Sequence, residues 1–202
     1  MPSSTLKLVL ALPFAANAQS SDADAGAAEI IDMVQGAEDA PITVIEYASF
    51  TCPHCARFHS DVYKLLRKNY IDTGKVKFIF REVYFDKYGM WASMIARCAG
   101  PDRFFGVIDQ MFEKQKTWSG AGNDLAIVTE LSKIGKLAGL GDDQINACLQ
   151  DADNLRNLVG WYKANMEEHK ISGTPSFVID GEMVSNRSYD ELSALLDEKL
   201  GS

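Results

Sequence analysis

The sequence predicts an α/β fold in which a central sheet is flanked by helices and interrupted by an all-helical segment. Three observations lead to this prediction. A strand, a helix and a second strand follow one another within residues 42–85, an order that places two parallel strands in one sheet. Residues 86–153 have only helical patterns. Residues 154–202 then return to a helix, a hairpin and a closing helix, so the helical segment is predicted to be an insertion.

Residues 1–18 have the features of an export signal. Lys7 precedes an apolar stretch that is too short to span a bilayer, and Ala16-Asn17-Ala18 fits a small-x-small cleavage site. We therefore expect cleavage near Ala18 and export to an oxidising compartment, where disulfides persist. Residues 19–35 are expected to form a flexible lead-in.

Length and charge limit the possible functions. The 202-residue chain is 47% hydrophobic, which is enough for one well-buried domain with an insertion. Its formal net charge is −8 and it has no block rich in Lys and Arg, so nucleic acid and anionic membranes are poor candidate partners. We expect a soluble monomer after cleavage.

Residues 42–48 are β-branched and almost continuously apolar, as expected for a central strand that is covered on both faces. Glu46 interrupts this run. It shares a strand face with Ile42 and Val44, so we expect its carboxylate to be buried beneath the turn that follows and its pKa to be raised by desolvation. A buried acid there could relay protons, whereas the alternative is an edge position or an ion pair with Lys or Arg.

The motif Cys52-Pro53-His54-Cys55 lies at the turn from this strand into a helix. Pro53 suits the first helical position, which makes Cys52 the N-cap. Unpaired backbone donors and the helix dipole then favour the Cys52 thiolate. Cys55 lies one turn further in and suits the role of resolving thiol, so the two cysteines are predicted to form a redox pair.

His54 is expected to donate a hydrogen bond to the thiolate and to stabilise the reduced form, which makes the disulfide more oxidising. Half of a zinc site is the alternative interpretation of C-x-x-C. The sequence has no second C-x-x-C, and Cys98 and Cys148 are isolated, so we predict no metal site.

The first helix is predicted over residues 53–70 and the second strand over residues 76–85. Apolar residues at helical spacing give the helix one buried stripe. His59 is interpreted as a solvated surface residue and is assigned no role.

Within the insertion, helices are predicted over residues 90–98, 103–116, 124–137 and 143–149. Cys98 and Cys148 each lie on an apolar helical face. In an oxidising compartment a disulfide between them would close a loop of about 50 residues and stabilise the fold by roughly 4 kcal/mol. Two buried free thiols are the alternative.

The C-terminal part is predicted to contain a helix over residues 154–168 and a hairpin with an Asp180-Gly181 turn. A capping box at Ser188 begins the closing helix. Pro175 directly precedes the first hairpin strand. A cis Thr174-Pro175 bond there would present the Thr174 backbone to a passing peptide, and an ordinary trans turn is the alternative.

Taken together, these motifs resemble the thioredoxin superfamily and, more closely, the DsbA family of bacterial periplasmic thiol:disulfide oxidoreductases. The resemblance covers about residues 36–200 and rests on Phe50-Thr-Cys-Pro-His-Cys55, on Glu46 six residues upstream, on the helical insertion and on Gly173-Thr-Pro-Ser-Phe177. It implies a thioredoxin-like fold, with a mixed central sheet formed by residues 36–85 and 154–202 and a helical domain formed by residues 86–153. It also implies that Cys52 attacks, Cys55 resolves, Glu46 is the buried acid and Pro175 is a cis-proline.

The resemblance further implies a periplasmic dithiol oxidase that needs no cofactor, acts on reduced exported proteins and is reoxidised by a membrane partner of the DsbB type. A disulfide isomerase or reductase of the same fold is the first alternative, because Thr174 stands where the best-known DsbA proteins carry Val. A metal-holding binding module is the second. The third is a glutathione-binding isomerase branch, which usually lacks the second cysteine and is disfavoured by Cys55.

Overall fold

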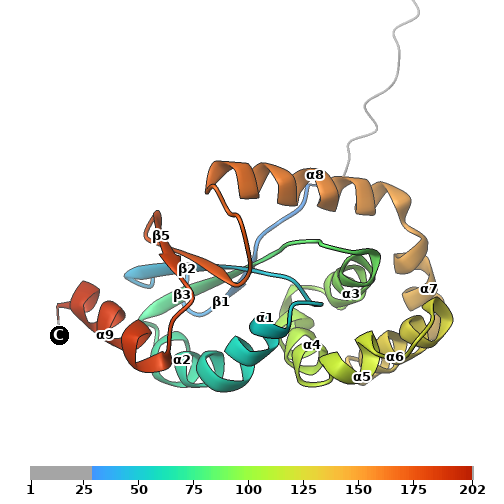
Figure 1. Ribbon diagram of the computed structural model, residues 1–202, viewed down its shortest axis with the longest axis horizontal. Helices are drawn as coiled ribbons and strands as arrows, with labels where there is room; N and C mark the ends of the chain where they lie inside the picture. The colour runs from blue at the N-terminus through green and yellow to red at the C-terminus, as the bar shows by residue number, and fades with distance from the viewer. Residues whose placement is uncertain (1–28, 202) are drawn as a thin grey trace, which may run out of the picture.

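The computed structural model describes residues 29–201 and contains one mixed sheet of five strands in the order β1-β3-β2-β4-β5 (Figure 1). The predicted signal, residues 1–18, and most of the predicted lead-in lie outside the described residues. In chain order the strands are β1 Met33–Gln35, β2 Ile42–Ala48, β3 Val76–Glu82, β4 Ser176–Ile179 and β5 Glu182–Ser185.

The central strand β2 pairs in parallel with β3 over seven residues and antiparallel with β4, so the mixed sheet predicted from the sequence is confirmed. The last two strands form the expected hairpin. Its turn contains Asp180 at φ 49° and Gly181 at φ 84°, which is the left-handed pair that a tight two-residue hairpin turn requires.

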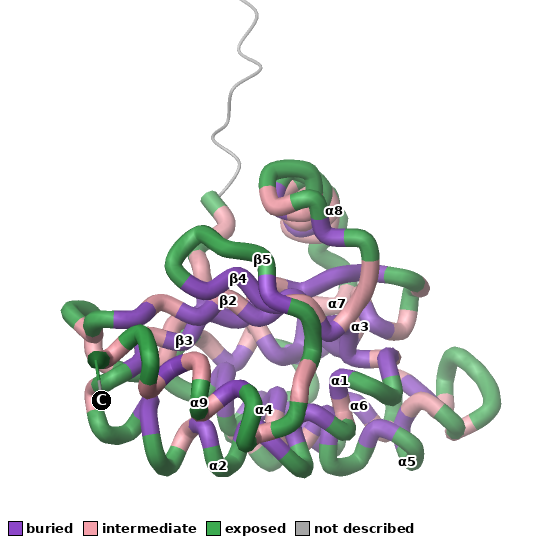
Figure 2. The backbone as a smooth tube through the Cα atoms, turned by 60° about the vertical axis from the view of Figure 1, so that its left-hand side comes forward, coloured by how far each residue is buried: buried purple, intermediate pink, exposed green. Residues whose placement is uncertain are grey.

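Helices cover both faces of the sheet. The long helix α8 (Ala152–Glu168) lies on one face, and the helix that follows the C-x-x-C motif lies on the other together with α9 (Tyr189–Leu200) (Figures 1 and 2). The helix after the motif is continuous but irregular. Its parts are α1 Pro53–Phe58, the π-helical turn η1 His59–Tyr63, α2 Lys64–Leu66 and a second π-helical turn η2 Arg67–Ile71.

Helices α3 to α7 lie between β3 and α8 in the chain and form the predicted insertion. They are α3 Lys87–Cys98, α4 Pro101–Glu113, α5 Gln115–Ser119, α6 Asp124–Leu137 and α7 Asp142–Gln150. The first begins three residues earlier than predicted because the Asp86 carboxylate accepts hydrogen bonds from the backbone N–H groups of Tyr88 and Gly89. For the same reason the strand prediction for residues 76–85 was too long, since the chain has left the sheet before Asp86.

The predicted flexible lead-in is wrong at its end, because Met33–Gln35 form β1 and pair antiparallel with β3. Three residues are too short to show the alternation that identifies a strand in a sequence. Gln35 is also fixed from the side by a hydrogen bond that the Tyr63 hydroxyl donates to its Oε1.

The core runs without interruption from the sheet into the insertion (Figure 2). Phe104 and Phe105 of α4 contact Phe80 and Phe78 of β3 edge to face, with ring centroids 5.7 and 6.2 Å apart. Nearer the motif, Phe112 stacks on Phe50 at 5.4 Å. These aromatic residues of the insertion therefore hold it against the sheet.

Two further links fix the insertion. Arg97 of α3 makes two hydrogen bonds of 2.6 Å to the Glu82 carboxylate at the end of β3, and both side chains are buried. Cys98 and Cys148 are joined in a disulfide between α3 and α7.

No helix in the described part of the chain is both long and apolar enough to cross a membrane.

We expect Arg97→Met to lower the free energy of unfolding by about 3–5 kcal/mol, because the change leaves the buried Glu82 carboxylate without its cation. The matched control is Arg156→Met, which breaks an exposed ion pair with Asp153 and is expected to cost at most about 1 kcal/mol. Urea unfolding of the two variants measures both values. Equal losses would show that the Arg97 pair does not stabilise the link between insertion and sheet.

Candidate active site

The C-x-x-C motif begins α1 in the geometry that the sequence predicts. Cys52 is the N-cap, with an extended backbone at φ −80° and ψ 119°, and Pro53 is the first helical residue. Both cysteines are free thiols in this structure. Cys52 is 9% exposed to solvent and Cys55 is fully buried, so a reactant from solvent meets Cys52 first.

The two sulfurs have opposite acidities. A hydrogen bond from the Cys55 thiol is the largest of the effects that lower the pKa of Cys52 from 9.0 to about 5, against the opposing effect of burial. Thr174 and the backbone N–H groups of Cys55 and His54 lower this pKa further. Burial, the same hydrogen bond and the charge of Glu46 raise the pKa of Cys55. Cys52 is therefore the more acidic of the two thiols.

The predicted backbone donors contribute to this acidity, since the backbone N–H groups of Cys55 and His54 lower the pKa of Cys52. The largest lowering contribution, from the Cys55 thiol, was not predicted. The side chain of His54 is exposed.

The loop before β4 forms the opposite wall of the site. The Thr174–Pro175 peptide bond is cis, and the Thr174 carbonyl oxygen lies 3.5 Å from Cys52 Sγ as its acceptor. The Thr174 hydroxyl is buried and has no hydrogen-bond partner among the described residues. Residues 122 positions apart in the chain thus meet at the reactive sulfur.

Beneath the motif, Glu46 is fully buried in β2, as predicted. Its partner is neither Lys nor Arg. Glu46 Oε2 lies 2.9 Å from Nε2 of His59, which is itself only 4% exposed. The prediction that His59 is a solvated surface residue is therefore wrong. The missed signal is its spacing of four residues from Cys55, which puts both on one helix face.

The insertion also reaches the site through Gln115 of α5, which the sequence analysis missed. Its buried side-chain amide donates to the carbonyl oxygens of Phe50 and Cys52 at 2.8 and 2.9 Å. On the other side, Thr51 donates to the Asp86 carboxylate at 2.6 Å. The turn that carries Cys52 is thus held by two residues of the helical segment.

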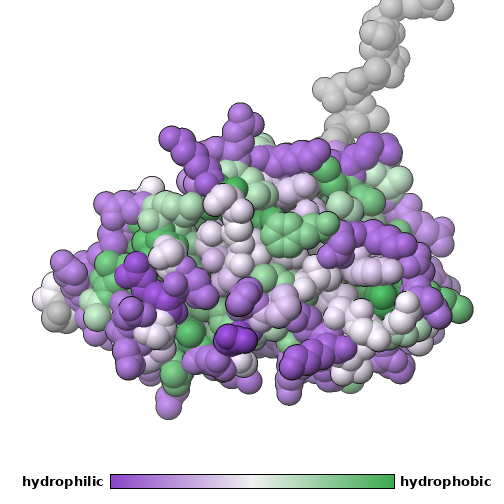
Figure 3. Space-filling view, viewed as in Figure 1, coloured by the Kyte–Doolittle hydropathy of each residue, from purple (hydrophilic) through white to green (hydrophobic). Residues whose placement is uncertain are grey.

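Figure 3 shows one face of the molecule, on which hydrophobic and weakly polar residues gather in the middle, with hydrophilic residues around and between them. Within residues 29–201, no three His, Cys, Asp or Glu side chains are grouped so that they could hold a metal ion.

The fold and this dithiol site together define a thioredoxin-like protein with a thiol–disulfide exchange centre. The thioredoxin family profile matches residues 29–198. A candidate protein-disulfide oxidoreductase of Rickettsia bellii is 35% identical over 170 residues, which are 84% of this chain and 64% of that protein. Disulfide bond formation protein D of Bacillus subtilis is 30% identical over 90% of this chain and 83% of its own length.

Solved structures agree with these relatives. The alpha-DsbA1 protein of Wolbachia pipientis superposes with a TM-score of 0.77 at 28% identity, covering 84% of this chain and 91% of that one. Oxidised BdbD of Bacillus subtilis superposes with a TM-score of 0.74 at 25% identity, covering 85% of this chain and 94% of that one. The chain belongs to the thioredoxin family and, within it, to the DsbA-like disulfide oxidoreductases. It spans a little under two thirds of the rickettsial relative's length.

We expect the reduced protein to show one thiolate titration with a midpoint near pH 5 when the ultraviolet absorbance of the thiolate is recorded as a function of pH. Because the pKa of Cys52 is lower in the folded than in the unfolded chain, the ionised sulfur stabilises the reduced fold. This stabilisation is complete above about pH 9 and is lost as the pH falls to about 5.

The control for this titration is Cys52→Ser, which should abolish both the absorbance change and the associated pH dependence of unfolding. A wild-type midpoint near the ordinary cysteine value of 9.0 would contradict the hydrogen-bonded arrangement of the two sulfurs.

Proposed function

We propose that the protein is a dithiol oxidase that transfers a Cys52–Cys55 disulfide to reduced client proteins. The observation that carries this proposal is the placement of the two sulfurs, with Cys52 partly accessible at the helix N-cap and Cys55 fully buried one turn further in. This placement lowers the pKa of Cys52 and raises that of Cys55. A disulfide whose reduced form contains a stabilised thiolate is easily reduced and therefore oxidises other dithiols.

The reaction proceeds in two exchanges. A client thiolate attacks Cys52 Sγ, the Cys52–Cys55 bond breaks, and Cys55 leaves as a thiolate that takes up one proton. A second client thiolate then attacks the client sulfur of the mixed disulfide, and Cys52 leaves as a thiolate. The client gains a disulfide, and its two electrons remain on the reduced pair.

Residues around the pair support these steps in the proposal. Pro53 fixes the first turn of α1, and with it the extended backbone of Cys52. His54 stabilises the leaving thiolate through its backbone N–H and, in the proposal, through its exposed ring. Glu46 exchanges the proton that Cys55 gains or loses.

We also propose that clients bind across the Thr174–Pro175 loop, where the Thr174 carbonyl oxygen faces the reactive sulfur. Backbone groups there can pair with an extended peptide of any sequence, which suits a protein with many clients. Phe85 is 59% exposed and directly precedes Asp86, the partner of Thr51, so it offers an apolar contact beside the site.

The cellular setting belongs to the same proposal. Export through the signal at residues 1–18 would place a monomer in the periplasm, where reduced exported proteins are its clients and a DsbB-type membrane protein reoxidises it. Residues 36–85 with 154–202 would form the thioredoxin-like domain that carries the chemistry. Residues 86–153 would form the helical domain that shapes its surroundings.

The direct test is the transfer of disulfides from the oxidised protein to a reduced, unfolded ribonuclease. We expect one client disulfide per molecule of protein consumed, with the accompanying reduction of Cys52 and Cys55. Cys55→Ser cannot form the Cys52–Cys55 disulfide and should transfer none; mixed with scrambled ribonuclease, its Cys52 thiolate should attack a client disulfide and accumulate as a mixed disulfide, because the resolving thiol is missing.

Cys52→Ser is the inactive control in this assay. If the oxidised protein left the reduced client unchanged while the reduced protein cleaved client disulfides, a reductase would replace the oxidase. If it only rearranged scrambled ribonuclease, an isomerase would replace it.

A further inference from the structure

The Glu46 carboxylate occupies an unusual place for a charged group. In the sheet it lies between Phe80 of β3 and Phe177 of β4, its register neighbours, and is fully buried. Oε2 is bound by His59, whereas Oε1 has no hydrogen-bond partner among the described residues. A buried acid with a free oxygen is costly, and proteins keep such groups mainly where they transfer protons.

The His59 side chain is also buried and constrained by its neighbours. It begins the π-helical turn η1, a type of irregularity that is frequent at functional sites. Its ring stacks on Phe112 of α4 with centroids 4.1 Å apart and an angle of 24°. Nε2 meets Glu46, and Nδ1 is buried without a partner among residues 29–201. A phenylalanine would make the same stacking contact, so packing alone does not explain a histidine here.

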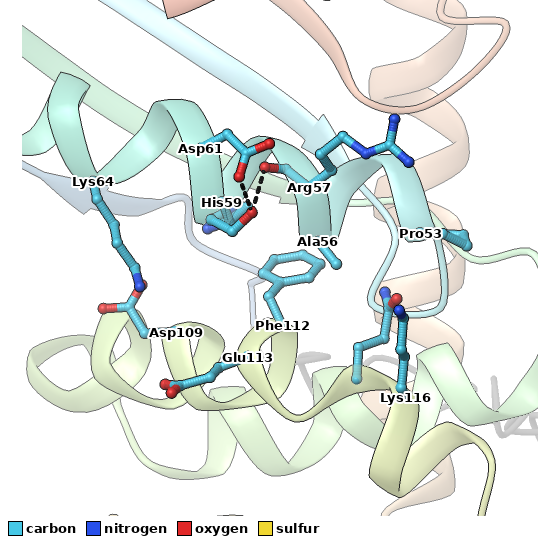
Figure 4. Close-up of a pocket in the computed structure, with 12 residues that line it drawn as sticks. Pro53, Ala56, Arg57, His59, Asp61, Lys64, Asp109, Phe112, Glu113 and Lys116 are labelled. Carbon is cyan, nitrogen blue, oxygen red and sulfur yellow. Dashed lines mark hydrogen bonds between the residues drawn. The ribbon is translucent and has the colours of Figure 1, made fainter.

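A cavity of about 550 Å³ reaches this histidine from the surface (Figure 4). It lies between the helix of the C-x-x-C motif and the insertion helices α4 and α5, and its lining includes His59, Phe112 and Gln115. The charged groups of its wall are Arg57, Asp61, Lys64, Asp109, Glu113 and Lys116.

Asp109 is the acid of this wall that interacts with His59. Burial raises the pKa of the Asp109 carboxyl, and the electrostatic effect of His59 partly opposes this rise. Lys64 reaches towards Asp109 from the facing helix (Figure 4), and Arg67 Nη1 lies 3.5 Å from its carboxylate. Cys55 and Tyr63 are the other titratable groups near the Glu46–His59 pair. The electrostatic neighbours of the pair thus include the buried Cys55 and, on the cavity wall, Asp109.

We propose that His59 is the positioning residue of Glu46 and the second carrier of the Cys55 proton, which it exchanges with the cavity bounded by Asp109. This inference rests on the proposed function, since it concerns the proton that Cys55 gains and loses. When Cys55 attacks a mixed disulfide at Cys52, its proton passes to Glu46 Oε1 and its sulfur electron pair forms the new bond. The departing thiolate takes the electrons of the old bond, and His59 returns the proton to the cavity.

The test separates the two sulfurs by reacting the reduced protein with Ellman's reagent in stopped flow. The first thionitrobenzoate is released when Cys52 attacks, at a rate that depends on reagent concentration. The second is released when Cys55 closes the disulfide, at a rate that does not. We expect His59→Gln to leave the first phase unchanged, to slow the second about tenfold at pH 7, and to alter its pH dependence.

Three variants accompany this one. Glu46→Gln removes the acid and should slow the second phase more, by about 100-fold. His59→Phe keeps the stacking on Phe112 and should slow the second phase as His59→Gln does. His169→Gln is the matched control on the other face of the sheet, where His169 meets the Tyr47 hydroxyl, and it should change neither phase.

The inference is overturned if His59→Gln and His59→Phe both close the disulfide at the wild-type rate and with the wild-type pH profile, because His59 would then only pack. An equal slowing in His169→Gln would also overturn it. A wild-type protein that shows no second phase would instead remove the proposed function, since Cys52 and Cys55 would then not form a redox pair.

Discussion

The effect of the buried Cys55 thiol on the Cys52 sulfur is the interaction on which the rest of the site depends. It requires two sulfurs one helical turn apart, one partly accessible and one fully buried, and it lowers the pKa of Cys52 while it raises that of Cys55. Oxidation to the disulfide removes both thiols and, with them, this effect. An interaction that exists only in the reduced pair favours the reduced pair, which is what a disulfide donor requires.

The helical insertion completes the site and does more than cover it. Gln115 holds the carbonyl oxygens on either side of the turn, and Phe112 stacks on both Phe50 and His59. Because the insertion shares one core with the sheet, these contacts are fixed relative to the C-x-x-C motif. The insertion thus supplies the outer wall of the site and, in our proposal, the acid Asp109 at the end of the proton path.

Local sequence patterns predicted most of the fold and the position of the C-x-x-C turn at the start of α1, because the information lies in short stretches. The C-x-x-C turn, the burial of Glu46 from its strand face, and the hairpin at Asp180 are of this kind. The missed features depend on contacts between distant segments or on very short ones. Gln115 meets Cys52 from 63 residues away, and β1 has three residues. His59 was wrongly predicted to be solvated, because a polar side chain usually faces solvent, whereas its spacing of four residues from the buried Cys55 places it on the buried helix face.

The central claim is that the reduced pair is stabilised, and the redox equilibrium of Cys52 and Cys55 against graded glutathione buffers tests it most directly. The Cys98→Ser/Cys148→Ser variant serves as the control that restricts the signal to this pair. We expect a reduction potential above about −200 mV, more oxidising than the glutathione pool of reducing compartments. A potential near about −270 mV, in the range of thioredoxin, would contradict it.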